Sequence, residues 1–210
     1  MHVRFLCKQI FLGIMLSQPK HLNSTPETYY HMASPSKEQQ VLRLILENSP
    51  TKHWHFEEIV KKARLTRAVA NKWLKKYCKE GLLKRIKEKG SFPYFTAGSN
   101  NPIYQAKKRL YALEELYQSG LIPYLSTINA RTIIVFGSII KGDWYKDSDI
   151  DIFIYGKTNG INKQEYEKKL KRNIELHVFE TKKDLKEVRT GLISNIINGY
   201  LVKGQLQELV

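Results

Sequence analysis

Apolar side chains recur at helical spacing in short stretches near the beginning of the chain. In the first stretch, Val41, Leu44 and Ile45 form a stripe behind Ser36, whose hydroxyl group can cap a helix. This pattern predicts a helix that begins after Ser36. A second apolar face predicts a short helix over residues 55–64, and its members are Phe56, Ile59, Val60 and Ala63.

A third apolar pattern begins behind Thr66, which can cap a helix over residues 67–80. Gly81 follows and can adopt the left-handed conformation that ends many helices. Two strand-like runs then lie on either side of Gly90, and their alternation of apolar and polar positions predicts a β-hairpin. Because the apolar residues of the third helix face inward, its outward face is strongly basic.

Three helices followed by a hairpin, in this order over residues 36–97, resemble the winged helix-turn-helix family. The resemblance implies that the third helix recognises DNA and that the hairpin is the wing. Side chains on the basic face can reach base edges and neutralise phosphates. The alternative is a small helical domain with a solvated, lysine-rich face. The candidate nucleic-acid-binding residues are Arg67, Asn71, Lys72, Lys75, Lys76 and Lys79.

Helical spacing continues over residues 101–119 and predicts a connecting helix that ends at Gly120, with one face as a candidate homodimer surface. Beyond it, the apolar run 132–136 is too short for a helix and predicts a buried strand. This strand leads directly to Gly137 and Ser138. Such a small pair lets the backbone approach a phosphate chain and presents amide groups and a hydroxyl group to it.

Two carboxylates lie close together in the next strand-like run, residues 149–154. Asp149 and Asp151 alternate with isoleucines, which places the acidic and the apolar side chains on opposite faces of a strand. Two carboxylates at this spacing can bridge a pair of hard cations. Mg²⁺ favours a few carboxylates together with phosphate oxygens of a substrate.

The segment 137–156 resembles the DNA polymerase β-like nucleotidyltransferase superfamily, in which Gly-Ser is followed by Asp-x-Asp on a strand. The resemblance extends over residues 130–180. It implies that Gly137 and Ser138 hold the phosphates of a nucleoside triphosphate. It also implies that Asp149 and Asp151 carry two Mg²⁺ ions.

The same resemblance implies a third carboxylate on the following strand. Glu175 is the candidate, although Asp is commoner at this place in the family. The expected catalytic residues and metal ligands are therefore Asp149, Asp151 and Glu175. His177 alternates with Glu175, and either side chain could help to deprotonate an acceptor hydroxyl group. A lone histidine on a strand is more often a packed residue, which is the interpretation we prefer for His177.

Other interpretations compete for the acidic segment. Asp147, Asp149 and Asp151 imitate the start of a calcium-binding loop, but the sixth position is Ile152 instead of Gly and the twelfth is not Glu. A helix cap or a solvated strand end would explain one of these aspartates. It does not explain two alternating carboxylates that follow a buried strand and a Gly-Ser pair at this distance.

Two aromatic residues, Trp144 and Tyr145, lie in the loop between the glycine-serine pair and the carboxylates, and we expect both to be exposed. They could stack on a nucleobase or pin the loop to the domain, and the sequence favours neither.

The charge balance favours an anionic partner. The 210 residues include 35 Lys and Arg against 20 Asp and Glu, a net charge of +15, which attracts polyanions whatever the fold. Most of the excess lies in residues 33–100, which carry 15 basic and 6 acidic side chains. Nucleic acid and a nucleotide are therefore the expected partners.

Cysteines and the opening segment indicate the cellular setting. Cys7 and Cys78 suggest neither a disulfide framework nor a thiolate metal site, so we expect a reducing, cytoplasmic environment. Lys8 and Gln9 interrupt the apolar opening, no cleavage site follows it, and it is too short to span a bilayer. We therefore expect no membrane partner, and we expect residues 1–35 to be disordered or incorrectly annotated.

Together these patterns predict an α/β (α+β) fold, in which a winged helix-turn-helix domain precedes a minimal nucleotidyltransferase domain with a small mixed sheet flanked by helices. The last part of the chain predicts a helix at about residues 182–188, another at 191–198 and a short extended piece after Gly199, and we expect this whole segment to cover the back of the sheet. The expected boundaries are 1–35 for the N-terminal segment, 36–100 for the winged helix, 101–120 for the connecting helix and 121–210 for the nucleotidyltransferase domain.

Two functional hypotheses follow. In the first, the protein transfers a nucleoside monophosphate from a nucleoside triphosphate to a hydroxyl group, using two Mg²⁺ ions. The acceptor is a protein, a nucleic acid or a small molecule, and the winged helix binds DNA. In the second, the protein is a DNA-binding transcriptional regulator whose catalytically weak nucleotidyltransferase-like domain senses nucleotide.

Overall fold

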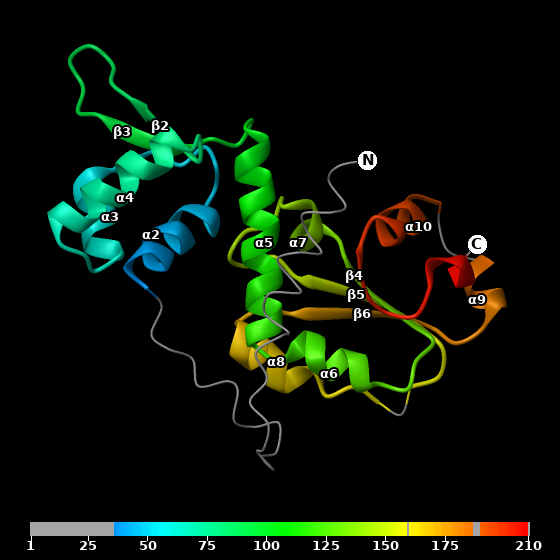
Figure 1. The fold of residues 1–210 in the computed structure, drawn as a ribbon. Helices are drawn as coiled ribbons and strands as arrows, with labels where there is room; N and C mark the ends of the chain where they lie inside the picture. The colour runs from blue at the N-terminus through cyan, green and yellow to red at the C-terminus, as the bar shows by residue number, and fades with distance from the viewer. Residues whose placement is uncertain (1–35, 159, 187–189, 210) are drawn as a thin grey trace, which may run out of the picture. The chain divides into compact units, whose positions relative to one another are not determined.

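A computed structural model describes residues 36–158, 160–186 and 190–209 (Figure 1). The predicted N-terminal segment 1–35 lies outside these residues. From Ser36 onward, the described chain belongs to one compact unit. No helix in the described ranges is both long and apolar enough to cross a lipid bilayer.

The first part of the chain contains the three predicted helices and the predicted hairpin. It also contains a two-residue strand that the sequence did not predict, because so short a run shows no alternation. This strand and the hairpin form an antiparallel sheet with the order β1-β3-β2. The elements are α2 (Lys37–Leu46), β1 (Trp54–His55), α3 (Phe56–Lys62), α4 (Arg67–Lys79), β2 (Leu83–Ile86) and β3 (Tyr94–Ala97).

Local hydrogen bonds explain where these helices begin and end. The Gln39 N–H donates to Ser36 Oγ at 3.1 Å, and the Ser36 N–H donates to Gln39 Oε1 at 2.7 Å, which completes a capping box. The Val69 N–H donates to Thr66 Oγ1 at the start of α4. Gly81 follows α4 with a φ of 75°. The predicted caps and the left-handed stop are confirmed.

The connecting helix is also present, as α5 (Pro102–Gln118). It buries Tyr104, Lys108, Ala112 and Leu116, which recur every four residues. Another stripe of the helix stays exposed and consists of Ile103, Leu110 and Tyr117. The homodimer remains a prediction. A short helix, α6 (Leu121–Thr127), follows α5 and was not predicted, because Gly120 and Pro123 indicate an end to helical structure.

The last part of the chain forms a four-stranded mixed sheet with the order β6-β5-β4-β7. β5 and β6 are parallel and are joined through α8, whereas β4 pairs antiparallel with both β5 and β7. The predicted small mixed sheet is confirmed. Its elements are β4 (Thr132–Phe136), α7 (Ser138–Lys141), β5 (Ile150–Tyr155), α8 (Lys163–Leu170), β6 (Ile174–Phe179), α9 (Lys182–Lys186), α10 (Thr190–Ile197), β7 (Tyr200–Lys203) and the 3₁₀ helix η2 (Leu206–Leu209).

The short extended piece behind Gly199 is β7, an edge strand of this sheet. It pairs through its backbone with β4 and so extends the sheet. α10, from the same final segment, covers one face of the sheet as expected, through Ile196 in the cluster that contains Ile134, Phe136 and Phe153.

The opposite face of the sheet belongs to a larger core. Ile133 and Ile152 lie in one cluster with Leu116 of α5 and with Val41 and Leu74 from the first part of the chain. Apolar packing is therefore continuous from α2 to the mixed sheet. The domain boundaries near residues 100 and 120 remain predictions.

Candidate active site

The turn between β4 and α7 brings the backbone against a carboxylate. Gly137 has a φ of 79°, and a Cβ atom at this position would lie 2.0 Å from Asp151 Oδ2. Only glycine fits both the conformation and the space. Next to it, the hydroxyl group of Ser138 has no hydrogen-bond partner among the described residues and remains available to a ligand.

Strand register brings two of the three predicted carboxylates together. Asp151 of β5 pairs directly with Glu175 of β6 in the parallel ladder. Together with His177 they form a group whose ligand atoms all lie within 4.8 Å of one another. Three side chains from two adjacent strands thus converge beside the Gly137 turn.

Asp149 lies outside this group. β5 begins at Ile150, whose N–H donates to the Asn173 carbonyl oxygen, so Asp149 belongs to the loop that enters the strand and is exposed. The expectation that Asp149 shares a strand face with Asp151 therefore needs correction. Its role as a metal ligand remains a prediction.

The carboxylate of Asp151 is in an unfavourable environment. Partial burial raises its pKa above the usual value for aspartate, and the negative charges of Glu175 and Asp149 raise the pKa further, whereas the nearby imidazole of His177 acts in the opposite direction. A cation among these groups would relieve both the burial and the repulsion. The donor set therefore fits a divalent metal ion.

The side chain of His177 is packed, as the sequence suggested, but its nitrogen points toward the acidic groups. Its ring lies against Phe136, with 5.2 Å between the ring centroids. Nε2 lies 3.7 Å from Asp151 Oδ1 and 3.6 Å from Glu175 Oε1. The sequence placed His177 beside Glu175 but could not show this direction.

Trp144 is buried, with no exposed surface, so the expectation that it lies exposed on the loop is wrong. Its ring packs in the core near Tyr111, and its indole N–H donates to the Lys108 carbonyl oxygen at 3.2 Å. Trp144 therefore pins the loop and is not available to a nucleobase. The neighbouring Tyr145 is 44% exposed.

Arg172 holds the same loop from the other side. The guanidinium Nη1 donates to the carbonyl oxygens of Tyr145 at 2.6 Å and Ser148 at 3.3 Å. It also lies over the Trp144 ring, 4.7 Å from the centroid. Arg172 is only 7% exposed, so the loop that leads to Asp149 is fixed by a buried cation. No sequence motif indicates this role.

Two lysines that follow the Gly137 turn in the sequence have specific contacts. Lys141 Nζ donates to Asn195 Oδ1 on α10 at 2.7 Å, which links α7 to the helix over the sheet. The backbone N–H of Lys146 donates to the Glu47 carbonyl oxygen at 3.0 Å. The loop before Asp149 thus touches the end of α2.

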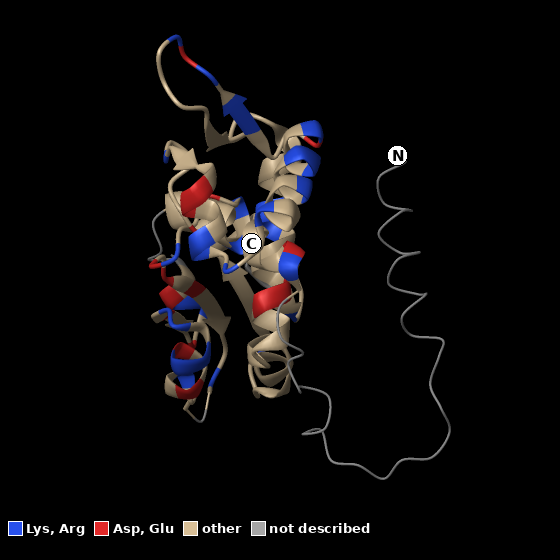
Figure 2. Ribbon diagram, turned by 90° about the vertical axis from the view of Figure 1, so that its left-hand side faces the viewer, with Lys and Arg blue, Asp and Glu red and all other residues tan. Residues whose placement is uncertain are grey.

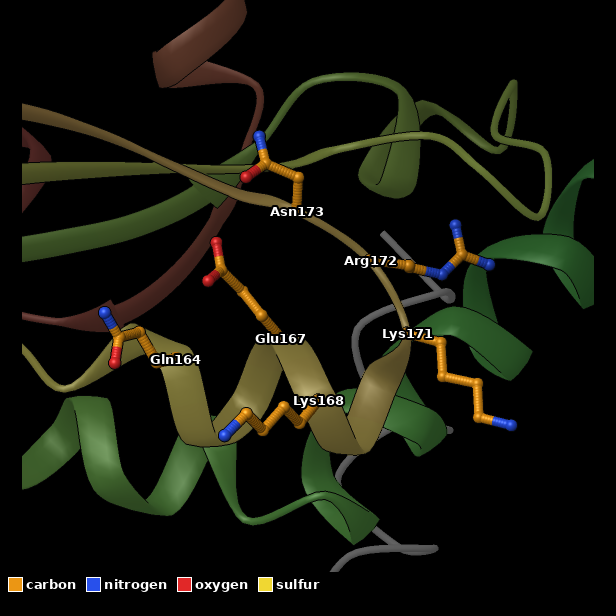
Figure 3. A pocket seen from close by; sticks show the side chains of 6 residues that line it. All are labelled: Gln164, Glu167, Lys168, Lys171, Arg172 and Asn173. Carbon is orange, nitrogen blue, oxygen red and sulfur yellow. The ribbon is translucent and has the colours of Figure 1, made fainter.

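A surface hollow lies at the beginning of β6, apart from the converging side chains (Figure 3). Glu167 accepts hydrogen bonds from the Ile174 N–H at 2.9 Å and forms an ion pair with Lys163 at 3.0 Å. Arg172 points away from Glu167 in this view. The one carboxylate among the lining residues therefore already has partners. Its lining residues are Gln164, Glu167, Lys168, Lys171, Arg172 and Asn173.

The predicted nucleic-acid-binding residues of α4 are all exposed. Two of them have acidic partners, since Arg67 pairs with Glu57 and Lys76 with Glu38, each at 2.8 Å. Lys72, Lys75 and Lys79 have no carboxylate partner among the described residues. The adjoining strand β2 adds two exposed basic residues that were not predicted, Lys84 and Arg85, and most of this strand is blue in Figure 2.

The small mixed sheet thus carries a glycine-serine turn next to paired carboxylates. Residues 120–206 match the family described as Polymerase beta, Nucleotidyltransferase. This part of the chain is a Pol beta nucleotidyltransferase domain, a family that typically uses divalent metal ions. Comparisons with curated proteins and with solved structures found no match.

Proposed function

We propose that the protein transfers a nucleoside monophosphate from a nucleoside triphosphate to a hydroxyl group on a protein, a nucleic acid or a small molecule. One observation carries the proposal: the Gly137 turn touches Asp151, which is in register with Glu175. A phosphate chain on that turn would lie next to the carboxylates. The match of residues 120–206 supports the same class of reaction.

In this proposal, Asp149, Asp151 and Glu175 hold two Mg²⁺ ions, which neutralise phosphate charge and activate the attacking oxygen when bound. Gly137 and Ser138 bind the phosphates through the backbone and the hydroxyl group. The acceptor oxygen bonds to the α-phosphorus as the bond to the bridging oxygen breaks, and pyrophosphate leaves with that electron pair. Glu175, whose side chain is 55% exposed, takes the acceptor proton.

The test is a labelling experiment. The purified full chain is incubated with each α-³²P-labelled nucleoside triphosphate and Mg²⁺, with and without cell extract. We expect label on a macromolecule or a small molecule, and we expect Asp151→Asn to abolish it. Asp147→Asn is the matched control, because Asp147 is exposed and lies outside the carboxylate group. Equal labelling by both variants would refute the assignment of Asp151.

We further propose that residues 36–97 form a winged helix that binds DNA through α4. The observation in favour is that all six predicted residues are exposed on one helix, and that Lys72, Lys75 and Lys79 have no carboxylate partner among the described side chains. Uncompensated lysines can neutralise phosphates, whereas paired ones must first lose a partner. The basic strand β2 extends the same charge.

Duplex binding tests this second proposal. Lys72→Ala with Lys75→Ala should weaken binding to any duplex and reduce the slope of log affinity against log salt by about 2, since each phosphate contact contributes about 0.9. Lys168→Ala with Lys171→Ala removes the same charge elsewhere and should change affinity less. If nucleoside triphosphate binds without any labelling and alters duplex affinity, the regulator with a nucleotide-sensing domain is the better description.

A further inference from the structure

His177 Nε2 is a buried polar atom with no hydrogen-bond partner among the described residues. Buried polar groups in folded proteins nearly always have one, so such an atom calls for a physical explanation. Its charged neighbours are the carboxylates of Asp151 and Glu175, at 3.7 and 3.6 Å. Both distances exceed those of a hydrogen bond.

Packing aims this nitrogen at the carboxylates. In the parallel ladder, His177 lies two residues after Glu175, so both side chains project from the same face of β6. The Phe136 ring supports the imidazole from β4. The imidazole therefore keeps its direction without a hydrogen bond from Nε2 to either acid.

The distances from His177 Nε2 to the two carboxylates suit a shared metal ion better than direct hydrogen bonds. An imidazolium paired with the acids would gain most by closing to hydrogen-bond distance, and here it does not. Two ligands of one metal ion lie roughly 3 to 4 Å apart, because each metal–ligand bond is about 2 Å long. The observed separations of 3.6 and 3.7 Å fall within that range.

We propose that His177 Nε2 is a metal ligand together with Asp151 and Glu175, and that this mixed site prefers a first-row transition-metal ion such as Mn²⁺ over Mg²⁺. The inference rests on the proposed function, which requires a divalent ion at this place. Mg²⁺ prefers oxygen ligands and keeps its waters, whereas transition-metal ions accept imidazole nitrogen readily. The histidine thus makes the site more selective than carboxylates alone.

Pulsed electron paramagnetic resonance of the Mn²⁺ complex of the full chain tests the proposal. A directly bound imidazole gives a ¹⁴N coupling, which we expect in the wild type and not in His177→Gln. The variant should also bind Mn²⁺ at least roughly tenfold more weakly, since even loss of an outer-shell partner can have that effect. His55→Gln is the matched control, because His55 is exposed on β1, and it should keep the coupling.

A second variant covers a failure of His177→Gln to fold. His177→Glu offers an oxygen ligand, so it should retain Mn²⁺ but lose the ¹⁴N coupling. Mn²⁺ that binds the wild type through Asp151 without a ¹⁴N coupling would overturn the proposal, as would no Mn²⁺ binding at all.

The two proposals fail in distinguishable ways. If the protein transfers label from nucleotide in Mg²⁺ but its Mn²⁺ complex shows no ¹⁴N coupling, the proposed function is supported and His177 is not a metal ligand. A ¹⁴N coupling without labelling under any condition would support the ligand assignment and count against nucleotidyl transfer.

Discussion

At the scale of single residues, Gly137 is a position that cannot change without disturbing the carboxylate of Asp151. Gly137→Ala would place a methyl group on Asp151 Oδ2 and force a side chain into a left-handed conformation. We expect a loss of stability of about 1–3 kcal/mol, the range for strained backbone positions. Because the displaced carboxylate is the proposed metal ligand, labelling should fall by at least roughly a hundredfold, an estimate from the cost of misplacing a reacting group by 1 Å.

Gly90 provides the control for that substitution. It also has a positive φ, of 81°, but a Cβ atom there would meet nothing within 4 Å. Gly90→Ala should therefore cost some stability in urea unfolding without a change in labelling. If Gly137→Ala labels as well as Gly90→Ala, the turn does not position the carboxylate.

Lys108 should have a measurable effect on how the free energy of unfolding depends on pH. It is 2% exposed, and its ammonium group lies 5.0 Å from the centroid of the Trp144 ring and 4.8 Å from that of Tyr145. Burial lowers the pKa of Lys108 to about 8, and the charge of Asp143 opposes the change. The folded protein therefore binds a proton less readily than the unfolded chain does.

The sign of the pH dependence follows from that difference. Between about pH 8 and pH 10.5 the unfolded chain holds the Lys108 proton and the folded protein does not, so the free energy of unfolding should rise with pH across this window. Lys108→Met removes the charge, so it should flatten this rise and relieve a cost of up to about 3 kcal/mol below pH 8. Urea unfolding of both proteins from pH 7 to pH 10.5 measures the effect; identical pH profiles would contradict it.

Residue identities could be predicted from sequence where chemistry is local. Gly137 and Ser138 stand out because a small pair follows a predicted buried strand, and Asp151 stands out because it alternates with isoleucines, whereas Glu175 is indicated only by the family resemblance. The direction of His177 and the burial of Trp144 could not be predicted, because each depends on residues from other elements. Phe136 supports the first, and Lys108 and Arg172 surround the second.

At the scale of elements, the loop between α7 and β5 depends on Arg172. Arg172→Met would leave the carbonyl oxygens of Tyr145 and Ser148 without their donor and would remove one of the two positive charges near Glu115, the other being Arg43. We expect a loss of about 1–3 kcal/mol in the free energy of unfolding, the range for leaving buried polar groups without a hydrogen-bond partner. The labelling rate should fall more than nucleotide affinity does, because the loop carries Asp149.

Arg172→Lys is the comparison for that variant. It keeps the positive charge near Glu115 but loses the forked geometry that serves two carbonyl oxygens. An intermediate stability is expected in urea unfolding. Full activity and stability in Arg172→Met would show that Trp144 alone holds the loop.

Most elements could be predicted because their side chains alternate or recur with a clear period. α4 and β5 are the clearest cases, the first with its cap at Thr66 and its end at Gly81. Two elements could not be predicted. α6 contains Pro123, and helices tolerate proline only near their start. β1 is a strand only because it pairs with β3. The parallel register of β5 and β6 likewise depends on tertiary contacts, so the sequence does not predict it.

At the scale of the whole molecule, the continuous core implies that the described chain unfolds as one unit. Trp54 lies in the first part and Trp144 in the nucleotidyltransferase domain, and both belong to the same apolar cluster. Variants that keep only one of these tryptophans, with the others changed to Phe, should show the same urea midpoint by fluorescence. Two separate midpoints would indicate independent domains with a boundary near residue 100.

The parallel pairing of β5 with β6 also limits how the length of the chain can vary. Asn173, the last residue before β6, accepts the Ile150 N–H, and α8 ends at Leu170, followed by Lys171 in a left-handed conformation with a φ of 54°. Insertion or deletion of one residue there would shift β6 by one position and turn Glu175 and His177 to the opposite face together, in exchange for Ile174 and Leu176. Homologues that retain the site should therefore differ freely in the length of the loop before α8 and hardly at all in the three residues after it.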